Sequence, residues 1–215
     1  VKHRELKIIY TTEDHIWVYP ITLLKFMNSK IKNNYLIHQS KFIKENAEFF
    51  YKECLEGKER HKIMFPTENS TTWSYKKYNT FALTAGSIIF YKLFIELKKI
   101  IFEYVGTKEP LWFQSWINIH EEDEVLNWHS HFNSIAHGYI SINPEKTKTV
   151  FENFEIDNKI GQIYIGESNE KHKVVVLNGF KKKRITIAFD VIDLKTFNKI
   201  KKKDSNDINL SFFPL

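Results

Sequence analysis

The sequence predicts an α+β fold in which helices pack on one face of a jelly-roll core, the double-stranded β-helix. The first part of the chain, to about residue 105, has mainly helical periodicity, whereas residues 111–193 change to short alternating runs. No internal repeat or linker interrupts the chain. We therefore expect one domain over residues 1–215, with a helical support at 1–105, the jelly-roll core at 111–193 and a tail at 196–215.

Two helices are expected in the first part. One spans residues 40–56, begins at a capping serine, and is expected to end at Gly57. The other spans residues 84–105, with phenylalanine, leucine and isoleucine on one face and lysine and glutamate on the opposite face; Gly106 is its expected stop. Residues 6–19 are an exception, because their isoleucine, valine, tyrosine and threonine content predicts a strand.

Short alternating runs separated by glycine, asparagine, aspartate and proline predict the strands of the core. The expected strands are 111–119, 127–132, 136–142, 149–154, 162–165, 173–177 and 184–192. The polar tail ends in an apolar stretch at 212–215, which we expect to fold back onto the body.

Composition excludes several classes of protein. Cys54 is the single cysteine, so the chain cannot form an internal disulfide or a thiolate zinc cluster, and we expect a cytoplasmic protein. The first ten residues are too polar for a signal peptide, and the apolar stretch at 87–105 carries too many charges to span a membrane. The net charge of +6 would suit nucleic acid, but we interpret the basic runs at 181–184 and 199–203 as a solvated hairpin and a solvated tail.

Histidines cluster in the second part of the chain, at His129, His131, His137 and His172. Residues i and i+2 of a strand point to the same face, so His129 and His131 can direct two imidazoles at one point. His172, from a later strand, would complete a triangular face. Three ligands on one side of an octahedral metal leave three positions open, which suits a bidentate cosubstrate and O2.

A possible binding site for the carboxylate group of a ligand lies later in the sequence, at residues 184–186. Arg184 and Thr186 share one face of the expected strand at 184–192. A buried arginine with a hydroxyl group beside it can hold a carboxylate in a bidentate grip. Together with the histidines upstream, this pair predicts a cosubstrate that carries a carboxylate.

Residues 112–192 resemble the 2-oxoglutarate/Fe(II)-dependent oxygenases of the prolyl-hydroxylase-like branch, and are most similar to oxygenases of marine phages and bacteria. The resemblance rests on the order of short motifs: Trp-x-Asn, Asn-x-x-His-x-His, Gly-Tyr, a glycine-led strand, a distal His and Arg-x-Thr. In this chain the motifs are Trp116-Ile117-Asn118, Asn127-Trp128-His129-Ser130-His131, Gly138-Tyr139, Gly161, His172 and Arg184-Ile185-Thr186.

The resemblance implies an enzyme that uses Fe(II), 2-oxoglutarate and O2 to hydroxylate an aliphatic C–H bond, releasing succinate and CO2. The implied substrate is a residue of a protein or peptide, with proline as the leading candidate. The implied site residues are the iron ligands His129 and His172, the distal-carboxylate ligands Arg184 and Thr186, and the pocket residues Asn118, Tyr139 and Ser141.

The third metal ligand departs from the family pattern. Most of the superfamily has Asp or Glu two residues after the first histidine, whereas this chain has His131. We predict that His131 is itself the third ligand. Glu170, two residues before His172, is the alternative, and for His137 we favour a pocket-lining or hydrogen-bonding role.

Two other functions stay open. A cupin-type three-histidine dioxygenase would not use 2-oxoglutarate and would have no similar need of Arg184. A basic jelly-roll module that binds nucleic acid or protein would need no iron. Loops at 10–19, 58–79 and 121–127 are expected around the pocket mouth, where Trp17, Trp73 and Tyr75 would contact a peptide, and the acidic run at 121–124 is expected to be exposed.

Overall fold

The computed structural model describes residues 8–12, 15–19, 29–32, 34–65, 71–72, 79–124, 126–203 and 211–215. The helices are α1 (Lys41–Glu45), α2 (Ala47–Met64), α3 (Thr80–Leu83), α4 (Ile88–Val105) and α5 (Leu194–Lys203). The strands of the main sheet are β3 (Ser29–Lys32), β4 (Tyr35–Gln39), β5 (Leu111–His120), β6 (Ala136–Asn143), β9 (Gln162–Gly166), β11 (Arg184–Asp193) and β12 (Phe213–Pro214). The remaining strands are β1 (Ile8–Thr12), β2 (His15–Tyr19), β7 (Thr147–Phe151), β8 (Glu155–Asp157) and β10 (His172–Val176).

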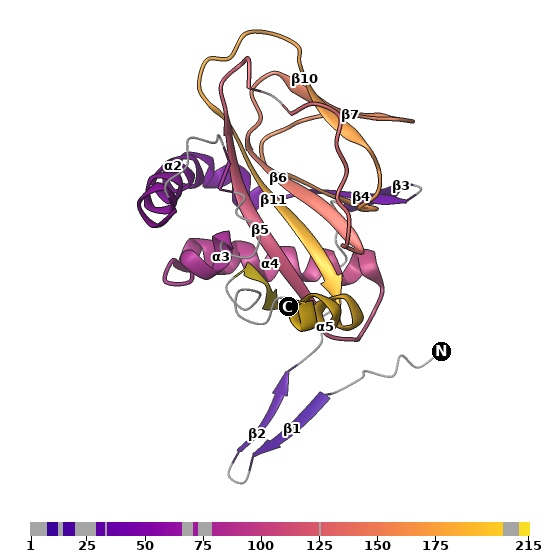
Figure 1. The fold of residues 1–215 in the computed structure, drawn as a ribbon. Helices are drawn as coiled ribbons and strands as arrows, with labels where there is room; N and C mark the ends of the chain where they lie inside the picture. The colour runs from indigo at the N-terminus through magenta and orange to yellow at the C-terminus, as the bar shows by residue number, and fades with distance from the viewer. Residues whose placement is uncertain are drawn as a thin grey trace, which may run out of the picture.

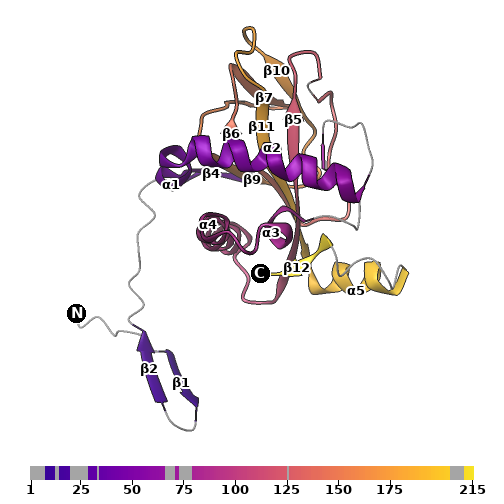
Figure 2. The same ribbon diagram turned by 90° about the vertical axis from the view of Figure 1, so that its left-hand side faces the viewer.

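The fold is α+β, with two antiparallel sheets facing each other (Figure 1). The main sheet has seven strands in the order β12-β5-β11-β6-β9-β4-β3, and the smaller sheet has three in the order β10-β7-β8. β1 and β2 form a separate two-stranded sheet. Helices α2, α3 and α4 cover the face of the main sheet that lies away from the smaller sheet (Figure 2).

The central strand β11 shows how the sequence produces these layers. Its residues Ile185, Ile187, Phe189 and Val191 are fully buried in the core beneath the helices. Burial of side chains of this size contributes about 1.5–3 kcal/mol each. The alternate residues of the strand point to the opposite face, toward the smaller sheet, because side chains alternate along a strand.

The helix predictions are correct in position and partly wrong in their limits. Ser40 caps α1, since its hydroxyl accepts a hydrogen bond from the Ile43 amide at 3.1 Å. The chain then turns at Asn46, and α2 continues through Gly57, so the expected stop at Gly57 is wrong. A glycine inside a helix costs only about 1 kcal/mol, which packing of the buried face of α2 outweighs.

The second helix ends where the sequence predicts but begins later. Gly106 terminates α4 in the left-handed conformation, with φ of 68°. Residues 80–83 form the short helix α3, and Ser87 caps the start of α4. The expected start at residue 84 is therefore wrong, because the chain turns between α3 and α4.

Strands β5, β6, β9, β10 and β11 all begin within one residue of the predicted positions. Residues 127–132, predicted as a strand, instead form a loop in which His129 makes a single β-bridge with His172. The predicted strand at 6–19 is a hairpin, β1-β2. The apolar C-terminal stretch folds back as predicted, with β12 paired to β5.

Several elements were not predicted, among them β3, β8 and α3. β4 extends the main sheet beside β9, in a part of the chain expected to be helical, and α5 forms in the polar tail. Alternating burial marks β4, where Leu36 and His38 are buried between half-buried neighbours. No helix in the described ranges is long and apolar enough to cross a membrane.

Candidate metal centre and cosubstrate pocket

Three adjacent strands of the main sheet place polar side chains on the face opposite the helices. β11 pairs with β5 and β6 on its two sides, and this register sets Thr186 opposite both Asn118 and Ser141. It also sets Arg184 opposite His120. All five side chains are buried, with at most 5% of their surface exposed.

A cavity of about 410 Å³ lies between this face and the loop at 126–133. Its lining includes most of the residues that the sequence predicted for the site: Asn118, His129, His131, Tyr139, His172, Arg184 and Thr186. Ser141 is buried beside Thr186 and does not itself line the cavity. The cavity has two chemically distinct ends.

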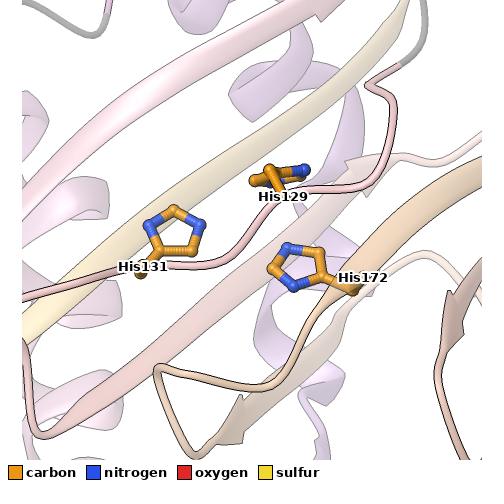
Figure 3. A group of neighbouring side chains, drawn as sticks. All are labelled: His129, His131 and His172. Atoms are coloured by element: carbon orange, nitrogen blue, oxygen red, sulfur yellow. The ribbon is translucent and has the colours of Figure 1, made fainter.

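The histidine end contains His129, His131 and His172. One ligand nitrogen from each lies within 4.8 Å of the other two, and the three rings surround a common space (Figure 3). Sequence reasoning placed His129 and His131 on a strand. The structure brings them together from a loop, so the side chains converge although the assigned element was wrong.

Backbone hydrogen bonds fix this loop against the smaller sheet. The amides of His129 and His172 each donate to the other residue's carbonyl oxygen, at 3.0 and 2.9 Å. The His131 amide donates to the Ser168 carbonyl at 2.8 Å. These bonds hold the histidines in place without a continuous strand ladder.

Hydrogen bonds also select the tautomer of each ring. The Nδ1–H of His129 donates to the Asn127 carbonyl at 2.7 Å, and that of His172 to the Glu170 carbonyl at 3.0 Å. A carbonyl oxygen can only accept, so both rings keep Nε2 free for a metal. His131 Nδ1 lies 3.3 Å from a carboxylate oxygen of Asp190, and its buried Nε2 makes no hydrogen bond within the described part of the chain.

Metal coordination requires neutral imidazoles, and burial favours the neutral form of His172 and His129. Burial, reinforced by the neighbouring histidines, lowers the pKa of His172 to about 2. Burial likewise lowers the pKa of His129, against the opposing effect of the Asn127 carbonyl. The donor set therefore fits a divalent transition metal bound by three neutral nitrogens.

Asp190 lines the same cavity, next to the histidine end, and was missed by sequence reasoning. Its carboxylate accepts hydrogen bonds from the Nδ1–H of His137 at 2.9 Å and from that of His131 at 3.3 Å. Burial alone would raise the pKa of Asp190, but these two hydrogen bonds outweigh it and hold the pKa at about 2. Alternation along β11 already placed Asp190 on the face of Arg184 and Thr186, and this was the signal available in the sequence.

Glu170, the alternative third ligand, points elsewhere. Its side chain lines a second cavity with Tyr35, Phe154 and Tyr164. It belongs to neither group of possible metal ligands among the described residues, which are His129, His131 and His172 in one group and His131, His137 and Asp190 in the other. The geometry thus favours His131 over Glu170.

The arginine end is lined by Arg184, Thr186 and Asn118, and His120 contacts Arg184 without lining the cavity itself. Arg184 is 3% exposed, and its guanidinium donates to Nδ1 of His120 at 3.1 Å. Its Nε has no hydrogen-bond partner, and no carboxylate of the described residues lies within ion-pair distance of it. Burial lowers the pKa of Arg184 to about 10, so the side chain stays cationic at neutral pH.

His120 is a second residue that the sequence reasoning missed. Burial, with the nearby Arg184, lowers its pKa to about 4. Its Nδ1 must accept from the guanidinium, so the ring is neutral and carries its hydrogen on Nε2. Its position two residues after Asn118 on β5 places both on the cavity face.

The remaining predicted residues have mixed outcomes. Tyr139 lines the cavity and donates a hydrogen bond to Asn158 at 3.2 Å. The acidic run at 121–124 is exposed, as expected. The side chains of Trp17, Trp73 and Tyr75 lie outside what the structure describes.

No family model matches the sequence, and a search of curated proteins finds no match. Solved structures do share the fold. The non-heme alpha ketoglutarate dependent carbocyclase SnoK from nogalamycin biosynthesis has a TM-score of 0.53 at 11% identity, covering 74% of this chain and 79% of its own. The epimerase SnoN of the same biosynthesis has a TM-score of 0.50 at 9% identity, covering 74% and 76%.

A second structure of SnoN, in complex with Fe3+, alpha ketoglutarate and nogalamycin RO, has a TM-score of 0.50 at 10% identity and covers 74% of this chain and 79% of its own. Identities this low show the fold alone. The predicted jelly-roll architecture with helices on one face is confirmed.

Proposed function

We propose that this protein is a non-heme Fe(II) enzyme that uses 2-oxoglutarate and O2 to oxidise a substrate. The observation that carries the proposal is Arg184, a buried cation without a carboxylate partner among the described residues, in the same cavity as three inward-facing imidazoles. A buried charge destabilises the fold by several kcal/mol unless a counter-ion compensates it. An anionic ligand that also reaches a metal satisfies both ends of the cavity.

Each group of residues has a distinct task in this proposal. His129, His131 and His172 would hold iron through Nε2. Arg184 and Thr186 would orient the distal carboxylate of 2-oxoglutarate. When bound, iron with 2-oxoglutarate and O2 supplies the oxidising power, with succinate and CO2 as co-products.

The reaction and the substrate are narrower proposals. We infer hydroxylation of an aliphatic C–H bond in a protein or peptide residue, with proline as the leading candidate by family resemblance. Phe132 lines the cavity and is 78% exposed, and Trp128 nearby is 48% exposed, so an apolar rim is available to a side chain of the substrate. The localisation we propose is the cytoplasm, where a chain with a single cysteine stays reduced.

Two rival functions are less well supported. A three-histidine dioxygenase that does not use 2-oxoglutarate gives Arg184 no partner. A module that binds nucleic acid would use the basic hairpin at 181–184, but Lys182 pairs with Glu48 at 3.3 Å and Lys183 with Glu121 at 3.1 Å. These pairs reduce the positive charge that the hairpin presents.

The direct test is turnover without a prime substrate. Purified protein with Fe(II) should slowly convert 2-oxoglutarate to succinate, and calorimetry should detect 2-oxoglutarate binding in the presence of Mn(II). Absence of both would contradict the proposal. Turnover of a small substrate by iron alone, with no 2-oxoglutarate consumed, would support the three-histidine dioxygenase instead.

A matched pair of variants tests the ligand assignment. His131→Ala should abolish most Fe(II) affinity and the visible charge-transfer band of the anaerobic iron–2-oxoglutarate complex. Glu170→Ala should keep both, because the side chain of Glu170 lines a different cavity. The reverse pattern would make Glu170 the ligand.

A further inference from the structure

The histidine end has an unusual distribution of charge. Three neutral imidazoles leave a bound Fe(II) ion with its full charge of two, because no carboxylate of the described residues belongs to the group formed by His129, His131 and His172. A carboxylate is nevertheless present in the same cavity, on Asp190, in contact with the Nδ1 side of His131.

We propose that Asp190 is the positioning residue of this metal centre, which holds His131 as a ligand and supplies, through that ring, the negative charge that the three histidines lack. The inference rests on the proposed function, since it assumes a metal at Nε2 of His131. Metal-bound histidines generally donate their other N–H to a carboxylate or carbonyl group, which fixes the ring and makes it a stronger donor.

The geometry around Asp190 leaves its carboxylate little freedom. One oxygen accepts from His137 Nδ1 at 2.9 Å and lies 3.2 Å from His131 Nδ1, while the other lies 3.3 Å from His131 Nδ1. β-sheet register sets Asp190 directly opposite His137. The Ile135 amide donates to the Val191 carbonyl at 2.8 Å, which fastens the end of the histidine loop to the same strand.

His137 is the second histidine, beside His131, that donates a hydrogen bond to the Asp190 carboxylate. Its ring stacks on that of His131, with centroids 3.5 Å apart and planes inclined by 9°. Both rings therefore present the same edge to Asp190, and both must carry hydrogen on Nδ1. His131 belongs both to the group with His129 and His172 and to a second group with His137 and Asp190. In a centre built on the first group, His137 supports the carboxylate.

Asparagine at position 190 would disrupt this arrangement with almost no change of shape. Its amide has one oxygen that accepts and one nitrogen that donates, whereas two Nδ1–H groups require acceptors. One imidazole would have to move its hydrogen to Nε2 or lose its partner. An imidazole with hydrogen on Nε2 cannot coordinate metal through that atom.

The experiment compares Fe(II) and Mn(II) affinity in wild-type protein, Asp190→Asn and the control Glu170→Gln, all at one neutral pH. Removing such a partner typically weakens metal binding by about 10–100-fold, and we expect a loss in this range for Asp190→Asn. The charge-transfer band of its anaerobic Fe(II)–2-oxoglutarate complex should also shift to shorter wavelength, because the iron becomes less electron-rich. Glu170→Gln removes a nearby carboxylate from a different cavity and should change neither quantity.

His137→Phe provides a second readout. If His137 only supports Asp190, this variant should lose far less metal affinity than His131→Ala. An equal loss would overturn the assignment and make His137 a ligand.

A double variant that restores a carboxylate to the site provides a second test if Asp190→Asn folds poorly. His131→Asp combined with Asp190→Asn moves the carboxylate to the metal, where the asparagine amide can donate to it, and should bind metal more tightly than Asp190→Asn alone or than His131→Ala. Failure of this recovery would count against the inference, as would wild-type affinity in Asp190→Asn. Either result would leave the proposed function intact, which fails if the wild-type protein with metal neither converts nor binds 2-oxoglutarate.

Discussion

The two ends of the cavity contain buried charges of opposite sign, Asp190 and Arg184, and these charges differ in the partners that the protein gives them. At the histidine end, Asp190 accepts hydrogen bonds from two imidazoles, so its carboxylate is stabilised by polar contacts within the protein. At the arginine end, Arg184 contacts the neutral His120 and has no carboxylate partner among the described residues. The hydrogen bonds of the Asp190 carboxylate are thus satisfied within the protein, and in the proposed function a metal would balance its negative charge. At the arginine end, the same proposal assigns that balancing role to an anionic ligand.

This difference shows how one strand, β11, can position both buried charges while its other face forms part of the core. Arg184 and Asp190 lie on the same face of β11, and the opposite face is apolar core. The core fixes the strand, and the strand fixes both charges relative to each other. In the proposed function, the spacing of the two charges on this rigid strand would select a ligand that reaches both.

Replacement of Arg184 should have the largest effect. Removing one partner of a desolvated charge pair costs about 2–5 kcal/mol, so Arg184→Met should weaken 2-oxoglutarate binding roughly 30-fold or more. Metal affinity should stay nearly unchanged. Calorimetry with Mn(II)-loaded protein measures the first quantity, and titration of Mn(II) without cosubstrate measures the second.

Lys183→Met is the matched control, because Lys183 is the neighbouring cation but is exposed and pairs with Glu121. It should bind 2-oxoglutarate like the wild-type protein. Arg184→Met should also leave the ligand-free protein as stable or more stable in urea, since an uncompensated buried charge is removed. An unchanged 2-oxoglutarate affinity would mean that the cavity does not receive a carboxylate at Arg184.

Acid should destabilise the metal-free protein in two pH ranges, the higher set by buried histidines and the lower by Asp190. His120 has a pKa of about 4 in the folded protein, below the ordinary value of about 6.5. Folding therefore favours its neutral form, and the metal-free protein should lose stability as pH falls from about 6.5 toward 4, by up to about 1.4 kcal/mol per pH unit for this histidine. Asp190 has its pKa lowered to about 2, so its contribution is present above about pH 4 and is lost only below that.

Urea unfolding of EDTA-treated protein at pH 7.5, 6 and 5 measures this loss. His137 and His172, with pKa values of about 4 and 2, add to it in the same direction. His120→Asn keeps an acceptor for Arg184 without a titrating ring, so its free energy of unfolding should fall less steeply with pH. A slope equal to that of the wild-type protein would contradict the buried neutral state of His120.

Thr186 should show the smallest effect. Its hydroxyl lies beside Arg184 on the cavity face, and one hydrogen bond contributes about 0.5–1.5 kcal/mol. Thr186→Val should therefore weaken 2-oxoglutarate binding by roughly 2–10-fold. Thr149→Val is the control, because Thr149 also lines the cavity but its hydroxyl already donates to Asn158 at 3.1 Å; equal losses in both variants would remove Thr186 from the binding site.

Much of the site could be predicted, because the alternation of side chains between the two faces of a strand depends only on neighbouring residues in the sequence. Arg184 and Thr186 had to share a face once the strand was identified, and the same rule would have identified Asp190 and His120. Both were overlooked because neither belongs to the motifs of the resembling family. A motif search finds the residues that relatives share, whereas alternation finds every residue on the face.

Other features could not be read from local pattern. Gly57 continues a helix because packing on the sheet outweighs its low helix propensity. Residues 35–39 became a strand because β9 offered an open edge, and the histidines at 129 and 131 converge through backbone bonds to β10 and to Ser168. These outcomes depend on partners distant in the sequence.

The sequence by itself determined the jelly-roll core and the helical layer, because hydrophobic periodicity can be recognised within short stretches of sequence. It also determined which imidazole, guanidinium and hydroxyl groups are available to the site. Only the tertiary structure decided which groups meet. It placed Glu170 in another cavity, set Asp190 next to His131, and left Arg184 beside a neutral histidine. The physical reason is that charge compensation in a buried site depends on distances between strands, which β-sheet register fixes and residue order alone does not.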